Sequence, residues 1–533
     1  MKIVVAEKMA SSAVDLFREP DWTVVTYDQI KDGLAGELAS ADALIVRSGV
    51  KVTADVFAIA PKLRVVGRAG VGVDNIEIEP ATRHGVVVMN APGANAVAVA
   101  EHTLSTMLAM ARHLCRANQL MHNGKWEKKS LQGTELRGKT LAIIGLGRIG
   151  MEVARRARAF GMEVVAHDPF VAVALAKDHG IRMGTLDEVY AAADYLTLHV
   201  GLTTQTTGMI NAESIKRMKR GIRLVNCARG ELIDEAALAS ALKEGQVAFA
   251  ALDVFAEEPL NNSPLLALEN VILTPHIGGS TDEAQEAVGY QIALQVKEYL
   301  KHGVIQNAVN VPSVSHDEYL ELKPYVVLAD RLGAFLAQVT EGTLEEIWLS
   351  YSGHIAEGKT DLIRNAAIAG ILNQGLEEKA NLVNAAAIAA SRGLLVHEER
   401  RPKGSTGGAG SVLSILVKAR KEEHIVKGAV LHKQAPRLLH IDGIEVEAPL
   451  EHNLIYIRNH DVPGVIGRVG TILGDHRVNI ADFSLGRRKD AAADSAPGEA
   501  IAVVHIDSRV PQTALAELKN IPAVKEVKTV HLF

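Results

Sequence analysis

The sequence predicts an α/β protein in which two doubly wound lobes with parallel sheets are followed by an α+β unit and a C-terminal βαββαβ domain. Three observations support this prediction. Short apolar strands alternate with helical stretches from the N-terminus onward, a glycine-rich run near residue 145 opens a second such alternation, and the last eighty or so residues show the order strand, helix, strand, strand, helix, strand.

The first hundred residues, which we call the first lobe, contain five short apolar strands separated by helical stretches. Such alternation is typical of a parallel sheet with helices on both faces. Because this region precedes the glycine-rich run, we expect it to form a separate, flavodoxin-like lobe. The predicted strands are Lys2–Ala6, Thr23–Thr26, Ala43–Arg47, Arg64–Arg68 and Val86–Met89.

The second lobe contains the run Gly145-Leu146-Gly147-Arg148-Ile149-Gly150, between a predicted strand, Thr140–Ile144, and a predicted helix, Met151–Phe160. Asp168 follows at the end of the next strand, Glu163–His167. Glycines here permit a tight turn and let the backbone approach a pyrophosphate, which the free N–H groups of the helix N-terminus bind. Asp168 can accept hydrogen bonds from ribose hydroxyls and repels the 2′-phosphate of NADP. The full βαβ context therefore predicts a Rossmann lobe that binds NAD, whereas the alternative is glycines in ordinary turns.

Two helical stretches are placed to connect the lobes: Val99–Met121 leads into the second lobe, and Glu283–His302 returns to the first. We therefore expect a discontinuous first lobe, residues 1–97 and 283–312, a second lobe of residues 98–282, and an active site in the cleft between them. The remaining predicted strands of the second lobe are Tyr195–His199, Arg223–Asn226, Phe249–Val254 and Val271–Thr274.

Composition and charge argue against several classes of protein. The chain has 533 residues, of which 48% are hydrophobic, and a formal charge of −6 gives no electrostatic reason to expect nucleic-acid binding. Cys115 and Cys227 are the only cysteines, which favours a reducing compartment over a disulfide scaffold. No apolar stretch approaches the roughly twenty residues that span a bilayer, and no signal peptide fits the N-terminus. We expect a cytoplasmic protein with no nucleic-acid, membrane or metal partner.

The composition changes at Asn310–Ser313, and two further units follow. Residues 317–450, which we call the middle unit, contain an alanine-rich helical stretch, Asn381–Arg392. Residues 452–533, the C-terminal domain, show the βαββαβ order of ferredoxin-like folds.

Three polar residues of the second lobe lie at or just after the ends of predicted strands: Arg229, Glu258 and His276. In an open parallel sheet, such positions face the ligand crevice. Oxidation of a secondary alcohol by hydride transfer requires a base for the hydroxyl proton, and histidine suits this task. Glu258 could stabilise the resulting imidazolium, and Arg229 could bind a substrate carboxylate.

Glu258 and His276 also have simpler interpretations. Glu258 precedes Pro259 and could only cap a turn, and a histidine after a strand is often structural. Cys227 could be a nucleophile, but with no evident base nearby we favour a packing or cofactor-lining role.

The first lobe also places cations at strand ends. Arg47 and Arg68 are the last residues of two predicted strands, beside small residues that include Gly70. Asn95 follows a third strand. These residues are candidates to bind an anionic group such as phosphate. The alternative is a solvated cation with a surface partner, which we prefer for the neighbouring Lys51.

The set of motifs resembles the D-isomer-specific 2-hydroxyacid dehydrogenases, in which an Arg, a Glu and a His follow the nucleotide fingerprint in this order. The resemblance implies that His276 is the acid/base, Glu258 its partner and Arg229 the substrate-orienting residue. One departure from the family pattern is His199-Val200-Gly201, where His-x-Pro is common. The implied cofactor-binding residues are Gly145, Gly147, Arg148, Ile149, Gly150, Asp168, Val200, Cys227, Ala228, Asp253, Gly278 and Gly279.

The resemblance extends over the whole chain to the long members of this family that act on 3-phosphoglycerate. The middle unit is similar to their intervening domain. Asp461-Val462-Pro463-Gly464, followed by Asn479, matches the pattern of their C-terminal ACT domain. The implied activity is NAD-dependent oxidation of 3-phospho-D-glycerate to 3-phosphohydroxypyruvate, the first step of L-serine biosynthesis, by a homotetramer. Asn459, Asp461 and Asn479 are then candidate ligands for L-serine as an effector, although they could be turn formers.

Two other functions stay open at this stage. One is a dehydrogenase or reductase for another 2-hydroxy acid, such as glyoxylate or 2-oxoglutarate. The other is a non-enzymatic, dinucleotide-sensing interaction protein, which would not need the set Arg229, Glu258 and His276.

Overall fold

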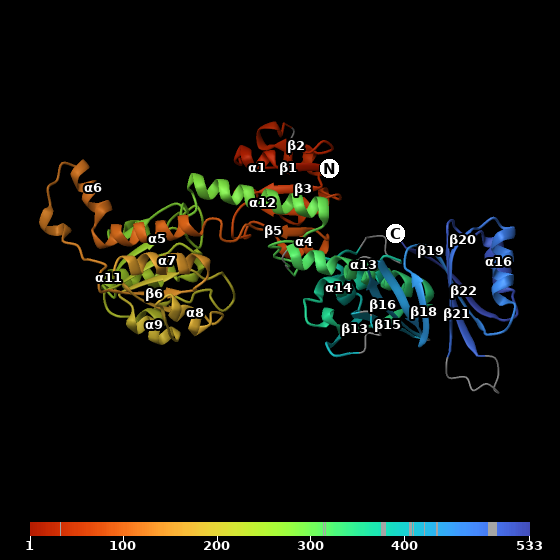
Figure 1. Ribbon diagram of the computed structural model, residues 1–533. Helices are drawn as coiled ribbons and strands as arrows, with labels where there is room; N and C mark the ends of the chain where they lie inside the picture. Colours follow the sequence, from red (N-terminus) through yellow and green to blue (C-terminus); the bar gives the residue numbers. More distant parts are fainter. Residues whose placement is uncertain are drawn as a thin grey trace.

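The computed structural model describes the chain except residues 32, 313, 315, 375–379, 405–407, 409, 421, 433–434, 489–497 and 533. The described residues form four sheets, in the two lobes, the middle unit and the C-terminal domain. Figure 1 shows the second lobe at one end of the molecule, then the first lobe, the middle unit and the C-terminal domain at the other end. The predicted fold class is confirmed.

The sheet of the first lobe is parallel and has the order β2-β1-β3-β4-β5, the doubly wound arrangement expected for a flavodoxin-like fold. Its strands are β1 (Lys2–Val5), β2 (Thr23–Thr26), β3 (Ala43–Val46), β4 (Val65–Arg68) and β5 (Val87–Met89). Its helices are α1 (Ser11–Asp15), α2 (Leu34–Leu38), α3 (Ala54–Ile59) and α4 (Ile78–Arg83). The long helix α12 (Asp282–His302) returns from the second lobe and packs on this sheet through Val288, Ile292 and Val296 (Figure 1).

The sheet of the second lobe is also parallel, with the order β12-β11-β10-β9-β6-β7-β8. The strand order reverses between β6 (Thr140–Ile144) and β9 (Tyr195–Leu198), and a dinucleotide binds at this point in such sheets. The other strands are β7 (Glu163–His167), β8 (Arg182–Met183), β10 (Ile222–Asn226), β11 (Val247–Leu252) and β12 (Val271–Leu273). The helices are α5 (Ala96–Ala111), α7 (Arg148–Ala159), α8 (Val173–Asp178), α9 (Leu186–Ala192), α10 (Ala212–Lys216) and α11 (Glu235–Glu244).

The helical stretch predicted over Val99–Met121 is two helices rather than one, which corrects the sequence-based expectation. Helix α5 ends at Ala111, His113 adopts a left-handed conformation with φ +51°, and α6 (Leu114–His122) begins at the next residue. Whereas α5 is largely buried, α6 has no buried residue. Figure 1 shows α6 projecting beyond the rest of the second lobe.

The middle unit has a mixed sheet of order β14-β13-β15-β16-β17-β18, in which only the pair β13–β14 is parallel. It is joined to the first lobe: Leu362 and Val383 belong to the hydrophobic core of that lobe, and Asn381 Nδ2 donates to Gly85 O at 2.9 Å. The elements are α13 (His316–Val339), β13 (Leu344–Gly353), α14 (Asp361–Leu372), α15 (Ala385–Ser391), β14 (Leu395–Arg401), β15 (Ser411–Ala419), β16 (Glu423–Leu431), β17 (Ala435–Ile441) and β18 (Ile444–Pro449).

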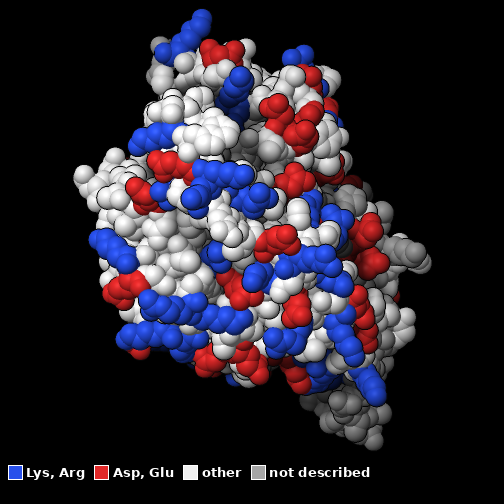
Figure 2. Space-filling model, turned by 90° about the vertical axis from the view of Figure 1, so that its left-hand side faces the viewer, with Lys and Arg blue, Asp and Glu red and all other residues white. Residues whose placement is uncertain are grey.

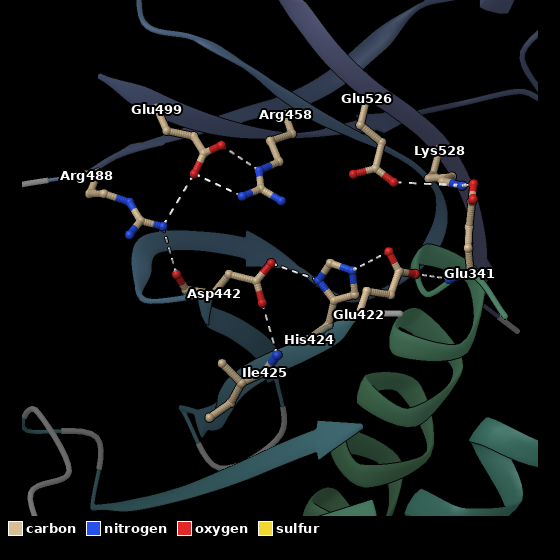
Figure 3. A network of polar contacts seen from close by, with 10 residues as sticks. All are labelled: Glu341, Glu422, His424, Ile425, Asp442, Arg458, Arg488, Glu499, Glu526 and Lys528. Atoms are coloured by element: carbon tan, nitrogen blue, oxygen red, sulfur yellow. Dashed lines mark hydrogen bonds and ion pairs between the residues drawn. The ribbon is translucent and has the colours of Figure 1, made fainter. Parts of the chain in front are cut away.

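The C-terminal domain has an antiparallel sheet of order β20-β21-β19-β22, as expected for a βαββαβ fold. One face carries the helices, and the other face packs on the middle unit, because Tyr456 and Val503 share a hydrophobic cluster with Leu438. A network of polar contacts crosses the same boundary (Figure 3). The elements are β19 (His452–His460), α16 (Val465–Asp475), β20 (Ile480–Arg487), β21 (Glu499–Ile506), α17 (Gln512–Lys519) and β22 (Val524–Leu532).

The surface gives two further observations. Figure 2 faces the end of the molecule formed by the second lobe, where basic and acidic side chains are interspersed. Among the described helices, none combines the length and the apolar character that a membrane span requires.

Candidate active site

A cavity of about 750 Å³ lies between the two lobes. The first lobe contributes Arg47 and Arg68, from the ends of β3 and β4, and the second lobe contributes Glu258 and His276. The carboxyl ends of parallel strands meet at one edge of each sheet, so the topology brings residues distant in sequence to one place. Asn95, Gly70 and Gly279 also line this cavity.

His276 and Glu258 form a hydrogen-bonded pair, with 2.8 Å between His276 Nδ1 and Glu258 Oε2. The other carboxylate oxygen of Glu258 accepts from Phe255 N at 3.0 Å, which fixes the side chain. Glu258 therefore both caps a turn and orients the imidazole. His276 has φ +55° just after β12, and its side chain is 52% exposed on the cavity wall. Nε2, the ring nitrogen not bonded to Glu258, is the atom available to a substrate.

Arg229 is paired with Asp74 of the first lobe. Its Nε and Nη2 lie 3.1 and 3.0 Å from Asp74 Oδ2, and its Nη1 donates to Ala228 O at 2.6 Å. Gly72 makes this path possible, because a Cβ there would lie 1.8 Å from Arg229 Nη2. Arg229 is not among the residues that line the cavity, so the structure brings together two of the three predicted catalytic residues.

The two first-lobe arginines differ in their partners. Arg68 Nε is buried without a hydrogen-bond partner among the described residues. Burial, followed by the nearby charge of Arg229, lowers the pKa of Arg68. Gly70 gives this side chain its room, because a Cβ there would lie 1.3 Å from Arg68 Nη1. Arg47 donates to Lys8 O at 3.3 Å and to Gln285 on α12. A buried guanidinium with an unused donor is the group that an anionic ligand would satisfy.

Asn95 is a second residue with an unused polar atom at the cavity. Its Oδ1 is buried and has no hydrogen-bond partner in the described part of the chain. Because an amide oxygen accepts, it suits a hydroxyl or N–H donor of a ligand. Gly279 lies close to it, since a Cβ there would be 3.0 Å from Asn95 Nδ2.

The glycine-rich turn after β6 has the geometry of a pyrophosphate cradle. Gly145 has φ +92°, and a Cβ there would lie 2.5 Å from His199 O. A Cβ on Gly150 would lie 2.1 Å from Gly145 O, so larger residues are excluded from both positions. Gly147 precedes α7 without capping it through a side chain, which leaves the first N–H groups of that helix to a ligand. These residues fit a bound dinucleotide.

Asp168 and Arg148 flank this turn. Asp168 accepts from Leu146 N and Phe170 N, both at 2.8 Å, so the carboxylate that we expect at the ribose is fixed beside the turn. Arg148 begins α7 and donates to Pro92 O of the first lobe, while Ile149 follows it in the same first turn.

Asp253 organises the loop that carries His276. It is 2% exposed and accepts from Thr274 Oγ1 at 2.6 Å, Ile277 N at 2.9 Å and Gly278 N at 2.7 Å. Burial raises the pKa of Asp253, but these bonds, with His102 Nε2 at 3.4 Å, outweigh it and lower the pKa overall. His102, Gln285 and Asp74 are contacts that the sequence analysis did not identify, since they depend on which helices and loops face the cavity.

Three of the predicted cofactor-binding residues follow β9 and β10 and carry uncharged side chains: Val200, Cys227 and Ala228. Burial raises the pKa of the Cys227 thiol to about 12, so the thiol remains protonated, which agrees with a lining role rather than a nucleophilic one. Ala228 N donates to Asn226 Oδ1 at 3.0 Å. Val200 lies against Gly145, and burial lowers the pKa of the preceding His199 to about 3.

The three candidate effector ligands of the C-terminal domain do not lie together within one chain. Asn459 and Asp461 line a pocket of about 420 Å³ at the end of β19. Asn479 precedes β20, at the opposite edge of the sheet, where its Nδ2 donates to Asp507 at 2.6 Å. The strand directions explain this, because β19 and β20 both run antiparallel to β21 and therefore begin at the same edge.

Comparisons with known proteins place this site in a class. Residues 104–278 match the NAD binding domain of the D-isomer specific 2-hydroxyacid dehydrogenases. The D-lactate dehydrogenase of Aquifex aeolicus, solved with NAD and lactic acid, is 29% identical, with a TM-score of 0.52 over 59% of this chain and 100% of that one. Fold and site therefore define an NAD-dependent oxidoreductase of the 2-hydroxyacid dehydrogenase class.

The remaining units narrow the class to one family. Residues 321–442 match the D-3-phosphoglycerate dehydrogenase intervening domain, and residues 453–523 match the ACT domain. The D-3-phosphoglycerate dehydrogenase of Methanocaldococcus jannaschii is 42% identical over 100% of both chains. That of Bacillus subtilis is 39% identical over 100% of this chain and 99% of its own. The chain belongs to the D-3-phosphoglycerate dehydrogenase family, and the resemblance inferred from its motifs is confirmed.

Proposed function

We propose that the chain oxidises 3-phospho-D-glycerate to 3-phosphohydroxypyruvate with NAD, the first step of L-serine biosynthesis. One observation carries this proposal. A single cavity contains a histidine–carboxylate pair on one wall and, on the other, two arginines of which one has an unused buried donor. The pair suits the oxidation of a hydroxyl group, and the cations suit a substrate with two anionic groups.

In this mechanism, His276 accepts the proton of the substrate hydroxyl at Nε2, while Glu258 stabilises the imidazolium through Nδ1. The glycine-rich turn and Asp168 would hold NAD, which would supply the acceptor for the hydride from the same carbon. Asp253 keeps the loop of His276 in place through Ile277 N and Gly278 N. The fixed carboxylates of Glu258 and Asp253 thus remove the need for reorganisation during proton transfer.

Different arginines bind the two anionic groups of the substrate, its phosphate and its carboxylate. Arg47 and Arg68 bind the phosphate, with Asn95 and Gly70 beside them, and Arg229 binds the carboxylate. Arg229 is paired with the carboxylate of Asp74 at 3.0 Å. When the substrate binds, its carboxylate replaces that of Asp74 as the partner of Arg229. This pair connects the two lobes, so the exchange is coupled to their relative position.

The experiment that tests the proposal is NADH formation at alkaline pH, with 3-phosphoglycerate compared with D-lactate, glycolate and D-2-hydroxyglutarate. We expect kcat/KM to be highest for 3-phosphoglycerate. A preference for another hydroxy acid would retain the dehydrogenase and reject the substrate. The remaining alternative, a non-enzymatic sensing protein, does not agree with the family to which the chain belongs.

We propose a homotetramer as the working assembly, with α6 and the segment after it as one contact surface. This arm projects from the second lobe and carries apolar side chains that no described part of the chain covers: Leu114 and Met121 are each 55% exposed, and Trp126 is 80% exposed. Large apolar side chains exposed together are typical of an interface. A mass of four chains in light scattering is expected.

We further propose that L-serine is an effector bound at the C-terminal domain. The end product of the pathway would then inhibit the enzyme that catalyses its first step. The match to the ACT domain and the pocket beside Asn459 and Asp461 support this. Asn479, at the far edge of the sheet, would contribute from a second copy of the domain. Addition of millimolar L-serine to the NADH assay should lower the rate.

Two further expectations remain proposals. We propose the domain division 1–97 with 283–312, 98–282, 317–450 and 452–533, which the four sheets support. We also propose a cytoplasmic location, for which the exposed, unpaired Cys115 thiol is the supporting observation.

A further inference from the structure

The pocket of the C-terminal domain contains a cation that the sequence analysis did not consider. Its wall is formed mainly by apolar side chains of β19, β20 and α16, among them Ile457, Phe483 and Leu485. Asp461 and Arg487 stand at this wall with opposite charges. They meet because β19 and β20 run in the same direction, so that residues at their carboxyl ends share one edge of the sheet.

Asp461 and Arg487 are in contact but only weakly engaged. Arg487 Nε lies 3.3 Å from Asp461 Oδ2, and no second contact of this pair is present among the described residues. The side chains are 66% and 32% exposed for Arg487 and Asp461. A single-contact ion pair at this exposure adds little to stability, so a ligand that satisfies both charges can replace it. Next to it, Asn459 is almost fully buried, and its Nδ2 donates to His460 O at 2.7 Å.

We propose that Arg487 is a ligand-binding residue of an amino-acid site, in which it binds the α-carboxylate while Asp461 binds the α-ammonium group. This inference rests on the proposed effector function of the domain and specifies how the ligand is recognised. An α-amino acid carries both charges on one carbon, so it inserts between the two side chains and gives each a new partner. The guanidinium of arginine binds a carboxylate through two parallel hydrogen bonds, which the present contact through Nε alone does not use.

The strand that carries Arg487 also reaches the middle unit. Side chains alternate along a strand, and Phe483, Leu485 and Arg487 line the pocket. On the other face, Ser484 Oγ donates to Glu447 O at 2.5 Å, and a Cβ on Gly486 would lie 2.2 Å from Glu445 O. Strand β20 is thus in direct contact with β18, without space for an intervening side chain.

Arg488, the next residue, extends this contact into the network of Figure 3. Its Nη2 lies 3.3 Å from Glu499 and 3.5 Å from Asp442 O of the middle unit. A ligand that moves Arg487 toward the pocket therefore also shifts the backbone of Arg488, and Arg488 is the residue that contacts Asp442. Occupancy of the pocket is in this way connected to the unit that joins the C-terminal domain to the first lobe.

The test is calorimetric titration of the full-length protein and of Arg487→Gln with three probes. The probes are L-serine, ethanolamine, which lacks the carboxylate, and 3-hydroxypropionate, which lacks the ammonium group. We expect Arg487→Gln to weaken L-serine by about tenfold or more, the effect of one charge-assisted contact, and to leave ethanolamine unchanged or tighter, since Asp461 loses its internal partner. Asp461→Asn should weaken L-serine without weakening 3-hydroxypropionate.

Arg468→Gln is the matched control, because Arg468 is an exposed arginine of α16 that does not line the pocket. It should bind L-serine as the unaltered protein does. Unchanged L-serine affinity in Arg487→Gln, with binding intact in the unaltered protein, overturns the role of Arg487 and leaves the effector function standing. If the unaltered protein binds no L-serine but another α-amino acid binds through Arg487, only the choice of serine fails. If no α-amino acid binds, both proposals fail, while the NADH assay still measures the dehydrogenase independently.

Discussion

Two histidine–carboxylate pairs in this molecule have the same geometry and different surroundings. His276 Nδ1 lies 2.8 Å from Glu258 Oε2, and His424 Nδ1 lies 2.8 Å from Asp442 Oδ2. The first pair lines the cavity between the lobes, with His276 52% exposed. The second joins β16 to the turn after β17, beneath the C-terminal domain, with His424 6% exposed (Figure 3).

The difference lies at the second ring nitrogen. His276 Nε2 belongs to a side chain on a cavity wall, whereas His424 Nε2 is buried with Glu422 at 3.7 Å and no hydrogen-bond partner among the described residues. A carboxylate at Nδ1 orients an imidazole in either place. Only access to Nε2 makes the imidazole a proton acceptor for a substrate, so the pair alone does not identify an active site.

The largest expected effect is on turnover when His276 is replaced. His276→Ala removes the proton acceptor and should lower kcat by about 10²- to 10⁴-fold, the usual contribution of general base catalysis. NADH binding, followed by fluorescence, should stay near that of the unaltered protein, because His276 lies outside the glycine-rich turn. Retention of full activity would reject the acid/base assignment and remove the functional distinction between the two pairs.

The next largest effect is expected for Arg47, because cations line the cavity beside the His276–Glu258 pair. Arg47→Ala should raise KM for 3-phosphoglycerate by about 10- to 100-fold, since a hydrogen bond to a charged group contributes about 1.5–3 kcal/mol. D-Lactate or another unphosphorylated hydroxy acid should lose much less. The comparison of the two substrates is the control, and equal losses for both would contradict the phosphate role of Arg47.

A smaller effect is expected from Glu258→Gln, which preserves the shape of the pair but removes its charge. The imidazolium then lacks the carboxylate that stabilises it, so kcat should fall by about tenfold or more, less than for His276→Ala. NADH binding, followed by fluorescence, should stay near that of the unaltered protein, because Glu258 lies outside the glycine-rich turn. An unchanged kcat would indicate that Glu258 acts only through the turn at Phe255.

Local patterns in the sequence predict the fold and the His276–Glu258 pair. The strands of both lobes follow from short apolar runs, and strand ends in a parallel sheet converge whatever the details of packing. The Arg229–Asp74 pair could not be predicted in this way, because it joins residues of two lobes through a path that Gly72 leaves open. The break between α5 and α6 depends on the conformation of a single residue, His113, which periodicity does not reveal.

The C-terminal pocket shows the same limit. The motif predicts Asn459, Asp461 and Asn479 as one set of ligands, but within one chain the sheet separates Asn479 from the other two. Arg487 lines the same pocket as Asp461 because it ends β20, whereas the sequence places it at the start of a polar stretch that is typical of a hairpin loop. Partners that are set by strand direction and pairing lie beyond what one sequence reveals.

The smallest effect on activity, and the sharpest contrast with His276, is expected for His424→Ala. Turnover should be unchanged, but the midpoint temperature of unfolding should fall. For a folding unit made of the middle unit and the C-terminal domain, the fall is about 2–4 °C for each kcal/mol of lost free energy of unfolding. The hydrogen bond that His424 Nδ1 donates to Asp442, opposed by burial, raises the pKa of His424. Because the folded pKa is raised, the ionised pair stabilises the protein fully below the unfolded pKa of about 6.5. This contribution is lost as the pH rises through the folded pKa, so the midpoint difference should be large at pH 6 and shrink at alkaline pH. Asp442→Asn should show the same dependence, and a difference that grows with pH would contradict a charged pair.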